Sequence, residues 1–537
     1  MIPFVVDYAS PSNYEADHER AFLGMSTDGR RPVRFHGRVV RQVFLLRVAM
    51  RALGEAIWSD DTWIGSSDIL DPVVTVHRDR LLFEAFSQDQ SVYAALIVDP
   101  TLFETEGEVV TGTTNVDFSA WLWGALGEMR SSRETTFRIG PEGFAVSTVG
   151  AGGRFERKVE LPDDWVRGFL QLQAAMAMPG THLRVRPIDL LAAIRFLRYT
   201  KARVSPRALR YELRPEQDAR LILEPWEREI VLKGAEHGYT KARTIRTWGR
   251  RRLKLIEGLL PFADAVDVYL KGRALPSFYA VKLPGMTFVL GLSGWSAQGF
   301  TGTGSFDLLA EAAAADDALL PRALDLVRSR VHIGLDAAAN GLGVDRPTAS
   351  KLFVRLSRRG QVIYDVETRD YRHRELFADP PDEARLFPPD PRQERAVEII
   401  GSERIRIDRC EVQERRKTRR LKTPEGPVLR ELIHRDWRVE GCVDSESSSV
   451  VIDDLGRLVF GACSCPFFRD NVLNRGPCEH MLALFSHSAS SREDLPSSSA
   501  VAPDAVSPTG PSRRALEAGE VEGIDPVDEA DDAEQHD

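Results

Sequence analysis

One short stretch near the C-terminal end of the sequence combines three cysteines and a histidine at fixed intervals. The spacing is C-x-C-x12-C-x-H, formed by Cys463, Cys465, Cys478 and His480. Three thiolates and one imidazole complete the tetrahedral set that Zn2+ prefers, and no coordination position then remains for water or substrate. The pattern therefore predicts a closed, structural Zn2+ site rather than a catalytic centre.

The residues around these four side chains predict how the chain presents them. Pro466 follows Cys465 and cannot continue a regular strand, so the first pair is expected at a bent strand end. Pro477 precedes the second pair and suits the first turn of a helix, whose partial positive charge stabilises a thiolate. A redox pair of cysteines, or four unrelated residues, are the alternatives to a metal site.

The ligand spacing, followed by the apolar sequence after His480, resembles the SWIM zinc finger family. The preceding residues agree, because 437–443 and 449–460 have strand-like patterns and Asp453-Asp454-Leu455-Gly456 is a turn sequence. The resemblance is confined to residues 436–487, which we assign to the finger. It implies zinc binding, and binding of nucleic acid or of another protein through the finger.

Length and composition place this finger in a multidomain protein. A chain of 537 residues, of which 43% are hydrophobic, is long enough for several domains with cores of their own. Its five cysteines form no disulfide framework, and the N-terminus lacks the pattern of a signal peptide. No apolar run approaches the length that spans a bilayer, so we expect a cytoplasmic location without a membrane partner.

The predicted fold class is α+β, with a large N-terminal region over residues 1–305 that contains one or two subdomains. Helical spacing predicts a long amphipathic helix near residues 39–57, followed by alternating strands and helices. This alternation is loosely similar to the repeats of sliding clamps, although no motif carries the similarity. The basic residues between 240 and 260 are expected on one helical face, which either follows a phosphate backbone or is simply solvated.

Residues 306–384 resemble a winged-helix domain in the order of their elements: helix, helix, turn, helix and hairpin. Asp345 is expected to cap the third helix, which ends at Gly360. In DNA-binding members this helix enters the major groove, whereas other winged helices serve as partner modules. The side chains expected to face nucleic acid from this helix and hairpin are Arg346, Ser350, Lys351, Arg355, Arg372 and Arg374.

Charge predicts the roles of the remaining segments. Residues 385–435 are expected to form a linker and a basic segment, exposed as a loop or strand end beside the finger. Further candidates for nucleic-acid contacts, or else residues of a solvated loop, are Arg415, Arg416, Lys417, Arg419 and Arg420. Residues 488–537 carry three arginines against thirteen acidic residues without periodicity, which predicts a disordered acidic tail.

The acidic tail accounts for the net charge of −9, so the rest of the chain is close to neutral and nucleic acid is not excluded as a partner. The sequence has no phosphate-binding loop of the form G-x-x-x-x-G-K-[ST] and no H-E-x-x-H motif. No catalytic residue and no small-molecule substrate are predicted. We therefore expect a non-enzymatic, zinc-binding protein that binds nucleic acid, with DNA favoured, through the finger and the winged helix. The alternative is a protein-interaction adaptor that recruits a partner such as a separate ATPase.

Overall fold

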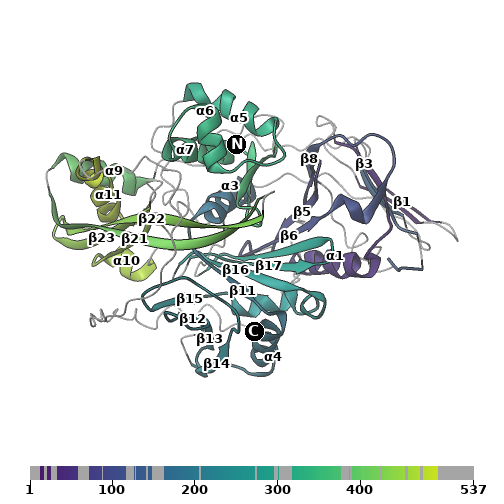
Figure 1. Cartoon of the computed structure of the whole chain (residues 1–537), viewed down its shortest axis with the longest axis horizontal. Coiled ribbons are helices and arrows are strands. Elements are labelled where there is room, and N and C mark those ends of the chain that lie inside the picture. Colours follow the sequence, from purple (N-terminus) through teal and green to yellow (C-terminus); the bar gives the residue numbers. More distant parts are fainter. Residues whose placement is uncertain are drawn as a thin grey trace.

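The computed structural model shows helices combined with several antiparallel sheets, which confirms the predicted α+β class (Figure 1). The structure describes residues 13–16, 21–25, 33–57, 72–87, 89–115, 126, 129–132, 134–140, 143–147, 163–204, 207–272, 275–294, 300, 317–376, 386, 390–402, 404–423, 426–453, 458–471 and 476–493. Most of the predicted acidic tail lies outside these residues. None of the described helices is long and apolar enough to cross a lipid bilayer.

An eight-stranded antiparallel sheet forms the centre of the N-terminal region. Its strands, in spatial order, are β11 (Thr181–Val185), β16 (Ala265–Leu270), β17 (Ser277–Leu283), β18 (Met286–Leu292), β6 (Val92–Val98), β5 (Leu81–Phe86), β4 (Val73–Val76) and β8 (Gly112–Asn115). Helices α1 (Val43–Ile57) and α3 (Asp163–Ala177) belong to two different cores. In β5, Leu81 packs into the core of α1, whereas Leu82 packs into the core of α3. Alternate residues of β5 thus pack into two cores on opposite faces of the sheet. This explains why the strand is buried along its whole length.

Helix α1 begins later than the predicted range of 39–57. Val39 ends strand β3 (Phe35–Val39), and Gln42, with a φ of 55°, turns the chain between strand and helix. The Leu46 amide donates a hydrogen bond to the Gln42 carbonyl at 2.8 Å, which starts the helix. Helical spacing does not reveal this start, because the residues on both sides of the turn are apolar.

Two smaller antiparallel sheets complete the N-terminal region. The six-stranded sheet comprises β1 (Asn13–Ala16), β2 (Ala21–Met25), β10 (Gly143–Ser147), β9 (Thr136–Gly140), β3 and β7 (Phe103–Thr105). The four-stranded sheet comprises β14 (Arg228–Val231), β13 (Arg220–Leu223), β12 (Leu209–Leu213) and β15 (Arg243–Thr247), with α4 (Pro187–Tyr199) packed against β14. The short 3-10 helices are η1 (Pro100–Leu102), η2 (Arg250–Ile256), η3 (Leu260–Phe262) and η5 (Asp317–Leu319).

The basic segment between 240 and 260 does not form the predicted helix. Its first half is strand β15, which pairs with β12, and Gly249, with a φ of 82°, turns the chain into η2. Arg246 Nε lies 3.1 Å from Glu224 Oε1, so this charge is paired inside the sheet. The β-branched Thr244, Ile245 and Thr247 favour a strand, and the spacing of the arginines conceals that preference.

Residues 320–376 contain three helices followed by a hairpin, in the order predicted from the sequence, and are called the three-helix–hairpin unit below. Its elements are α5 (Leu320–Arg328), α6 (Leu335–Leu342), α7 (Arg346–Arg358), β19 (Val362–Asp365) and β20 (Asp370–His373). Asp345 caps α7 as predicted, because its side chain accepts a hydrogen bond from the Thr348 amide at 2.9 Å.

Residues 391–493 form a unit around a four-stranded antiparallel sheet, called the finger unit below. Its elements are α9 (Pro391–Gly401), β21 (Ile405–Thr423), β22 (Gly426–Val443), β23 (Glu446–Ile452), β24 (Leu458–Cys463), α10 (Pro466–Asn471) and α11 (Glu479–Glu493). Strand β22 crosses the expected boundary between residues 435 and 436, so the basic segment and the finger share one sheet. Helix α11 passes the expected end at residue 487, and Ser488 is fully buried.

Candidate metal centre and nucleic-acid interface

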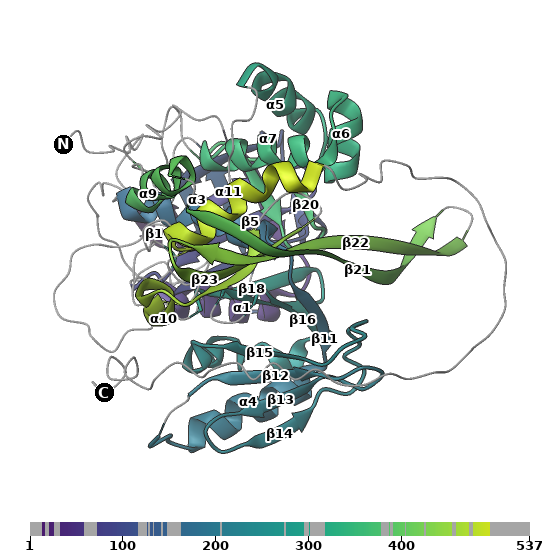
Figure 2. The ribbon, with the colours of Figure 1, turned by 90° about the vertical axis from the view of Figure 1, so that its left-hand side faces the viewer.

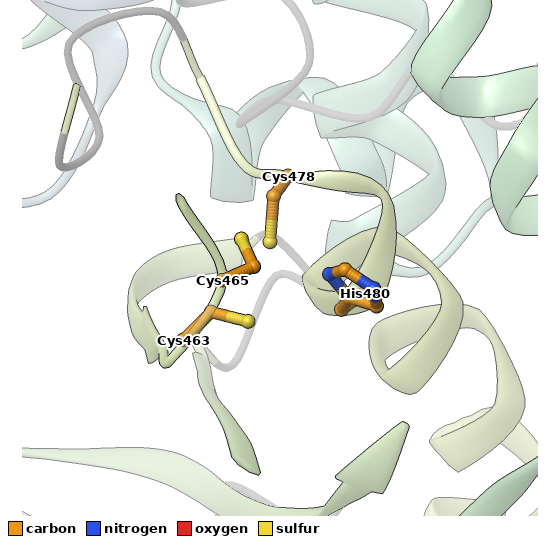
Figure 3. Close-up of side chains that lie close together, drawn as sticks. All are labelled: Cys463, Cys465, Cys478 and His480. Atoms are coloured by element: carbon orange, nitrogen blue, oxygen red, sulfur yellow. The ribbon is translucent and has the colours of Figure 1, made fainter. Parts of the chain in front are cut away.

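The four predicted zinc ligands come together in the finger unit (Figure 3). Each side chain offers one ligand atom, and these atoms all lie within 4.8 Å of one another. Cys463 ends β24, Cys465 precedes α10, Cys478 precedes α11, and His480 lies in the first turn of α11. A strand end and a helix start thus bring two pairs of ligands to one centre.

The burial of the cluster fits a closed metal site. Cys478 is fully buried, and even His480 is only 9% exposed. The His480 Nδ1 atom is buried and has no hydrogen-bond partner among the described residues, which leaves an imidazole nitrogen for a metal ion.

The chemistry of the thiols also fits a cation. Hydrogen bonding with the Cys463 thiol lowers the pKa of Cys465 and raises the pKa of Cys478, because thiols packed this closely share protons and cannot all ionise. A divalent cation removes this conflict, since its charge stabilises all the thiolates at once. The donor set and its burial therefore fit Zn2+, which would be held by the three sulfurs and the imidazole.

The backbone explains how two ligands one residue apart reach one centre. The Ser464 amide donates a hydrogen bond to the Ser447 carbonyl at 2.9 Å, which keeps the chain in the sheet as far as Cys463. Helix α10 then begins, and its Phe468 amide donates a hydrogen bond to the Cys465 sulfur at 3.4 Å. The bent strand end that the sequence predicts is therefore present, and it passes directly into a helix.

The second ligand pair is held by the start of α11. Gly476, with a φ of 76°, turns the chain toward Pro477, and the Leu482 amide donates a hydrogen bond to the Cys478 carbonyl at 3.0 Å. Cys478 is therefore the residue that precedes the helix, and Pro477 lies before the first turn rather than in it. The residues from Met481 to Phe485 are buried, so the core of the finger unit fixes this end of the helix.

A residue outside the motif, Arg392, contacts both sides of the site. Its Nη1 atom donates a hydrogen bond to the Pro477 carbonyl at 3.1 Å, next to Cys478. Its guanidinium lies 4.8 Å from the ring centre of Phe467, which follows the first ligand pair. Asp390 orients the guanidinium by accepting a hydrogen bond from Nε at 2.9 Å. The sequence analysis missed Arg392 because nothing distinguishes it from nearby surface arginines.

Replacing Arg392 with methionine is expected to weaken zinc binding about tenfold, because contacts behind the ligands orient them. Methionine keeps the apolar stem but removes the hydrogen bond and the charge over the ring. Competition with a chromophoric chelator measures the zinc affinity. Arg395→Met, at an exposed position on the same helix, is the matched control and should leave the affinity unchanged. Equal affinities of the two variants would contradict the role of Arg392.

The predicted basic run lies in a two-stranded ribbon that extends from the finger unit (Figure 2). Strands β21 and β22 pair along their length, whereas β23 joins β22 only from Trp437 to Val443. In the described part of the chain, residues 413–423 and 426–436 pair only with each other, over roughly 35 Å at about 3.3 Å per residue. The positions on β21 in this ribbon include Arg415, Arg416, Lys417, Arg419 and Arg420. The segment is thus a long strand rather than the predicted loop or strand end.

Helix α7 does not present the face that the sequence predicts. It packs against α3, and Ser350 is only 2% exposed, so the expectation that Ser350 faces away from the core is wrong. Arg346 forms an ion pair with Asp336 at 2.7 Å, and Lys351 and Arg355 are half-buried. For these three basic residues a nucleic-acid contact stays a prediction. The sequence cannot locate α3 beside α7, because the two helices are far apart along the chain.

Arg372 is also not exposed on the hairpin, as its predicted contact with nucleic acid would require. Arg372 is 2% exposed, and its Nη1 and Nε atoms lie 2.9 Å from Asp79 and 2.8 Å from Asp365. Arg80 adds a contact of 2.6 Å with Asp365. Burial alone would raise the pKa of Asp365, but Arg80 and Arg372 outweigh this effect and lower it. The arginine is therefore engaged in an internal network rather than exposed to a ligand.

Arg374 is likewise buried, at 1% exposure, and forms an ion pair with Glu84 of β5. Glu84 also accepts a hydrogen bond from the Tyr93 hydroxyl at 2.7 Å. The two partners are 290 residues apart in the sequence, so no local pattern predicts the pair. Together with Arg372, this contact joins the three-helix–hairpin unit to the N-terminal sheet.

The strand end, the helix start and the buried cysteine and histidine side chains define a structural metal site of the zinc-finger class. Residues 449–489 match the model of the SWIM zinc finger. The chain therefore contains a SWIM zinc finger and binds Zn2+, which confirms the resemblance and the cofactor predicted from the sequence. No curated protein matches the sequence.

Several solved structures resemble about half of the chain at low sequence identity. Proliferating cellular nuclear antigen from Entamoeba histolytica is 11% identical, with a TM-score of 0.34 over 49% of this chain and 99% of its own. PCNA from Thermococcus kodakaraensis is 13% identical, with a TM-score of 0.33 over 48% and 99% of the two chains. The PCNA2–PCNA3 complex from Sulfolobus tokodaii is 9% identical, with a TM-score of 0.34 over 48% of this chain and 99% of its own. TM-scores of this size establish no shared fold, so the similarity to sliding-clamp repeats stays a prediction.

Proposed function

We propose that this protein is a non-enzymatic, zinc-dependent nucleic-acid-binding protein that acts in the cytoplasm, with DNA as the favoured ligand. The observation that carries the proposal is the position of the basic run on the β21–β22 ribbon. Residues 415–423 contain six basic residues and no acidic residue. A two-stranded β-ribbon fits the major groove of DNA, and basic residues along it can neutralise phosphates.

Zinc supports this contact through the sheet that carries the ribbon. Strand β22 continues from the ribbon into the sheet, where it pairs with β23, and β23 pairs with β24 up to Cys463. Cys463 at the end of β24 and Cys478 and His480 at the start of α11 would hold the metal together, and α11 packs on β21, β22 and β23. The base of the ribbon is therefore fixed by the same unit that binds Zn2+, and we assign no covalent step to the protein.

The three-helix–hairpin unit has a different role here from that of a DNA-reading winged helix. Its third helix packs against α3, and Arg372 and Arg374 are buried. We therefore propose that the unit has mainly a structural role, through its contacts with the N-terminal region. Its partly exposed Arg346, which is paired with Asp336, provides a secondary contact to phosphates.

A titration of the full chain with fluorescent duplex DNA tests this proposal, with RNA of equal length in parallel. If the ribbon neutralises about six phosphates, raising the salt from 50 to 200 mM should lower the affinity about a thousandfold. Replacing Arg415, Arg416, Arg419 and Arg420 by glutamine should flatten the salt dependence. The same change at Lys241, Arg243, Arg251 and Lys254 is the matched control and should leave it unaltered. Undetectable binding at low salt would overturn the proposal.

A protein-interaction adaptor is the second candidate function, and exposed apolar side chains on the finger unit favour it. Val397, Val412 and Phe460 are 68%, 41% and 46% exposed. These side chains lie on α9, β21 and β24, and exposed apolar surface of this kind can form part of a protein interface. A stable co-purifying partner, such as a separate ATPase, combined with no binding of DNA or RNA, would select this function.

A further inference from the structure

A groove of about 400 Å³ lies between α1 and the chain around η2, on the N-terminal region. Phe44, Val48 and Ala52 line one wall from α1, and Leu255 and Leu259 line the other. The α1 wall runs over twelve residues, from Phe44 to Glu55, roughly 16 Å at a rise of about 1.5 Å per residue. A segment of about five extended residues has this length. The groove therefore has the length and the apolar walls to hold a short peptide segment.

The groove carries a positive charge above these apolar walls. Arg47, Arg51 and Lys254 are among its lining residues, together with one carboxylate, Glu55. Lys254 is exposed. A groove with apolar walls and an excess of basic over acidic side chains favours a segment in which acidic residues alternate with apolar ones.

Exposed aromatic rings and a glycine are found on the walls of the groove and beside it. Phe44 and Phe262 are 45% and 43% exposed and pack edge to face at 5.6 Å between ring centres. Large apolar side chains at this exposure often belong to a binding surface. On the opposite wall, a Cβ atom added at Gly258 would meet no other atom within 4 Å. A side chain at this position can therefore enter the groove without displacing the protein.

The chain carries a segment of matching chemistry beyond its last described residue, Glu493. Residues 521–525 read Val-Glu-Gly-Ile-Asp, with two apolar and two acidic side chains in five positions. An extended chain from residue 493 to residue 521 reaches up to roughly 95 Å, which exceeds the expected diameter of a body of this size. Covalent attachment also gives such a segment an effective concentration on the order of millimolar.

We infer that the groove between α1 and η2 binds the acidic C-terminal segment of the same chain, centred on residues 521–525. The apolar side chains of the segment pack on Val48 and Leu259, and its carboxylates pair with Arg51 and Lys254. This intramolecular contact is independent of the ribbon and of nucleic acid, so either proposal can fail without the other.

Site-specific photo-cross-linking in the full chain tests this inference. The variant Gly258→p-benzoylphenylalanine places the reactive group in the groove, and mass spectrometry identifies the peptide that it captures. We expect a cross-link to residues 515–532 in a product that migrates as a monomer. Adding Lys254→Glu should lower the yield about fivefold, because an exposed ion pair becomes a repulsion.

The matched control is p-benzoylphenylalanine at Gly401, where an added Cβ atom also meets open space. It should not capture the tail. Three outcomes would overturn the inference: no cross-link from position 258, capture of a different segment, or capture of the tail of a second copy. Equal yields from positions 258 and 401 would also overturn it, because the tail would then contact the surface without preference.

Discussion

Replacing Cys478 with serine is expected to abolish zinc binding and to unfold the finger unit. The fully buried thiol is one of four ligands, and a structural zinc site of this kind contributes on the order of 10 kcal/mol to folding. Serine supplies no thiolate, so the remaining ligands would hold the ion weakly. Bound zinc, measured with a chromophoric chelator, should be lost. Limited proteolysis should cleave between residues 436 and 487, where the wild-type protein resists.

Cys442→Ser is the matched control for this experiment. Cys442 is a half-buried cysteine of β22 that does not belong to the metal cluster. This variant should retain full zinc content and protease resistance. If Cys478→Ser also retained both, the four residues would not form the zinc site. Zinc removal by a chelator should reproduce the Cys478→Ser pattern in the wild-type protein, and readdition of zinc should reverse it.

Replacing Glu84 with leucine is expected to destabilise the protein by about 3–5 kcal/mol, because it leaves the buried Arg374 charge without its partner. The change also removes the acceptor for the Tyr93 hydroxyl. The double variant Glu84→Leu/Arg374→Leu should recover much of the loss, since a buried ion pair can be exchanged for apolar residues at little cost. Denaturant unfolding followed by tryptophan fluorescence measures the stabilities.

Glu375→Gln provides the comparison, because Glu375 pairs with Arg328 at 2.5 Å on the surface of the same unit. Exposed pairs contribute at most about 1 kcal/mol. If the Glu84 and Glu375 variants lost equal stability, the buried pair would not hold the three-helix–hairpin unit on the sheet. No recovery in the double variant would show that packing, rather than charge, causes the loss.

The zinc site and the start of α7 could be predicted from the sequence because their information is local. Ligand identity and spacing lie within eighteen residues, from Cys463 to His480. The cap of α7 depends on Asp345 and the Thr348 amide, three residues apart. In each case the residue types carry the chemistry, and the chain between them is too short to separate the partners.

The rest could not be predicted, because it depends on residues that are distant in the sequence. Arg372 and Arg374 lie in a sequence that is typical of an exposed basic hairpin, yet they form ion pairs with Asp79 and Glu84 of the N-terminal region. The ribbon was also hidden, since a run of basic residues has no alternation of apolar and polar positions. Only the pairing of β21 with β22 identifies it as a strand.

The enclosure of the metal cluster also affects how quickly the ion can leave. A site with four protein ligands, none more than 9% exposed, offers no position where a competing ligand can attack first. Release of zinc then requires local opening of α11 from the sheet, so the exchange rate follows the rate of that opening. A chelator in large excess should therefore remove zinc at a rate that is set by this opening and does not rise further with the chelator concentration.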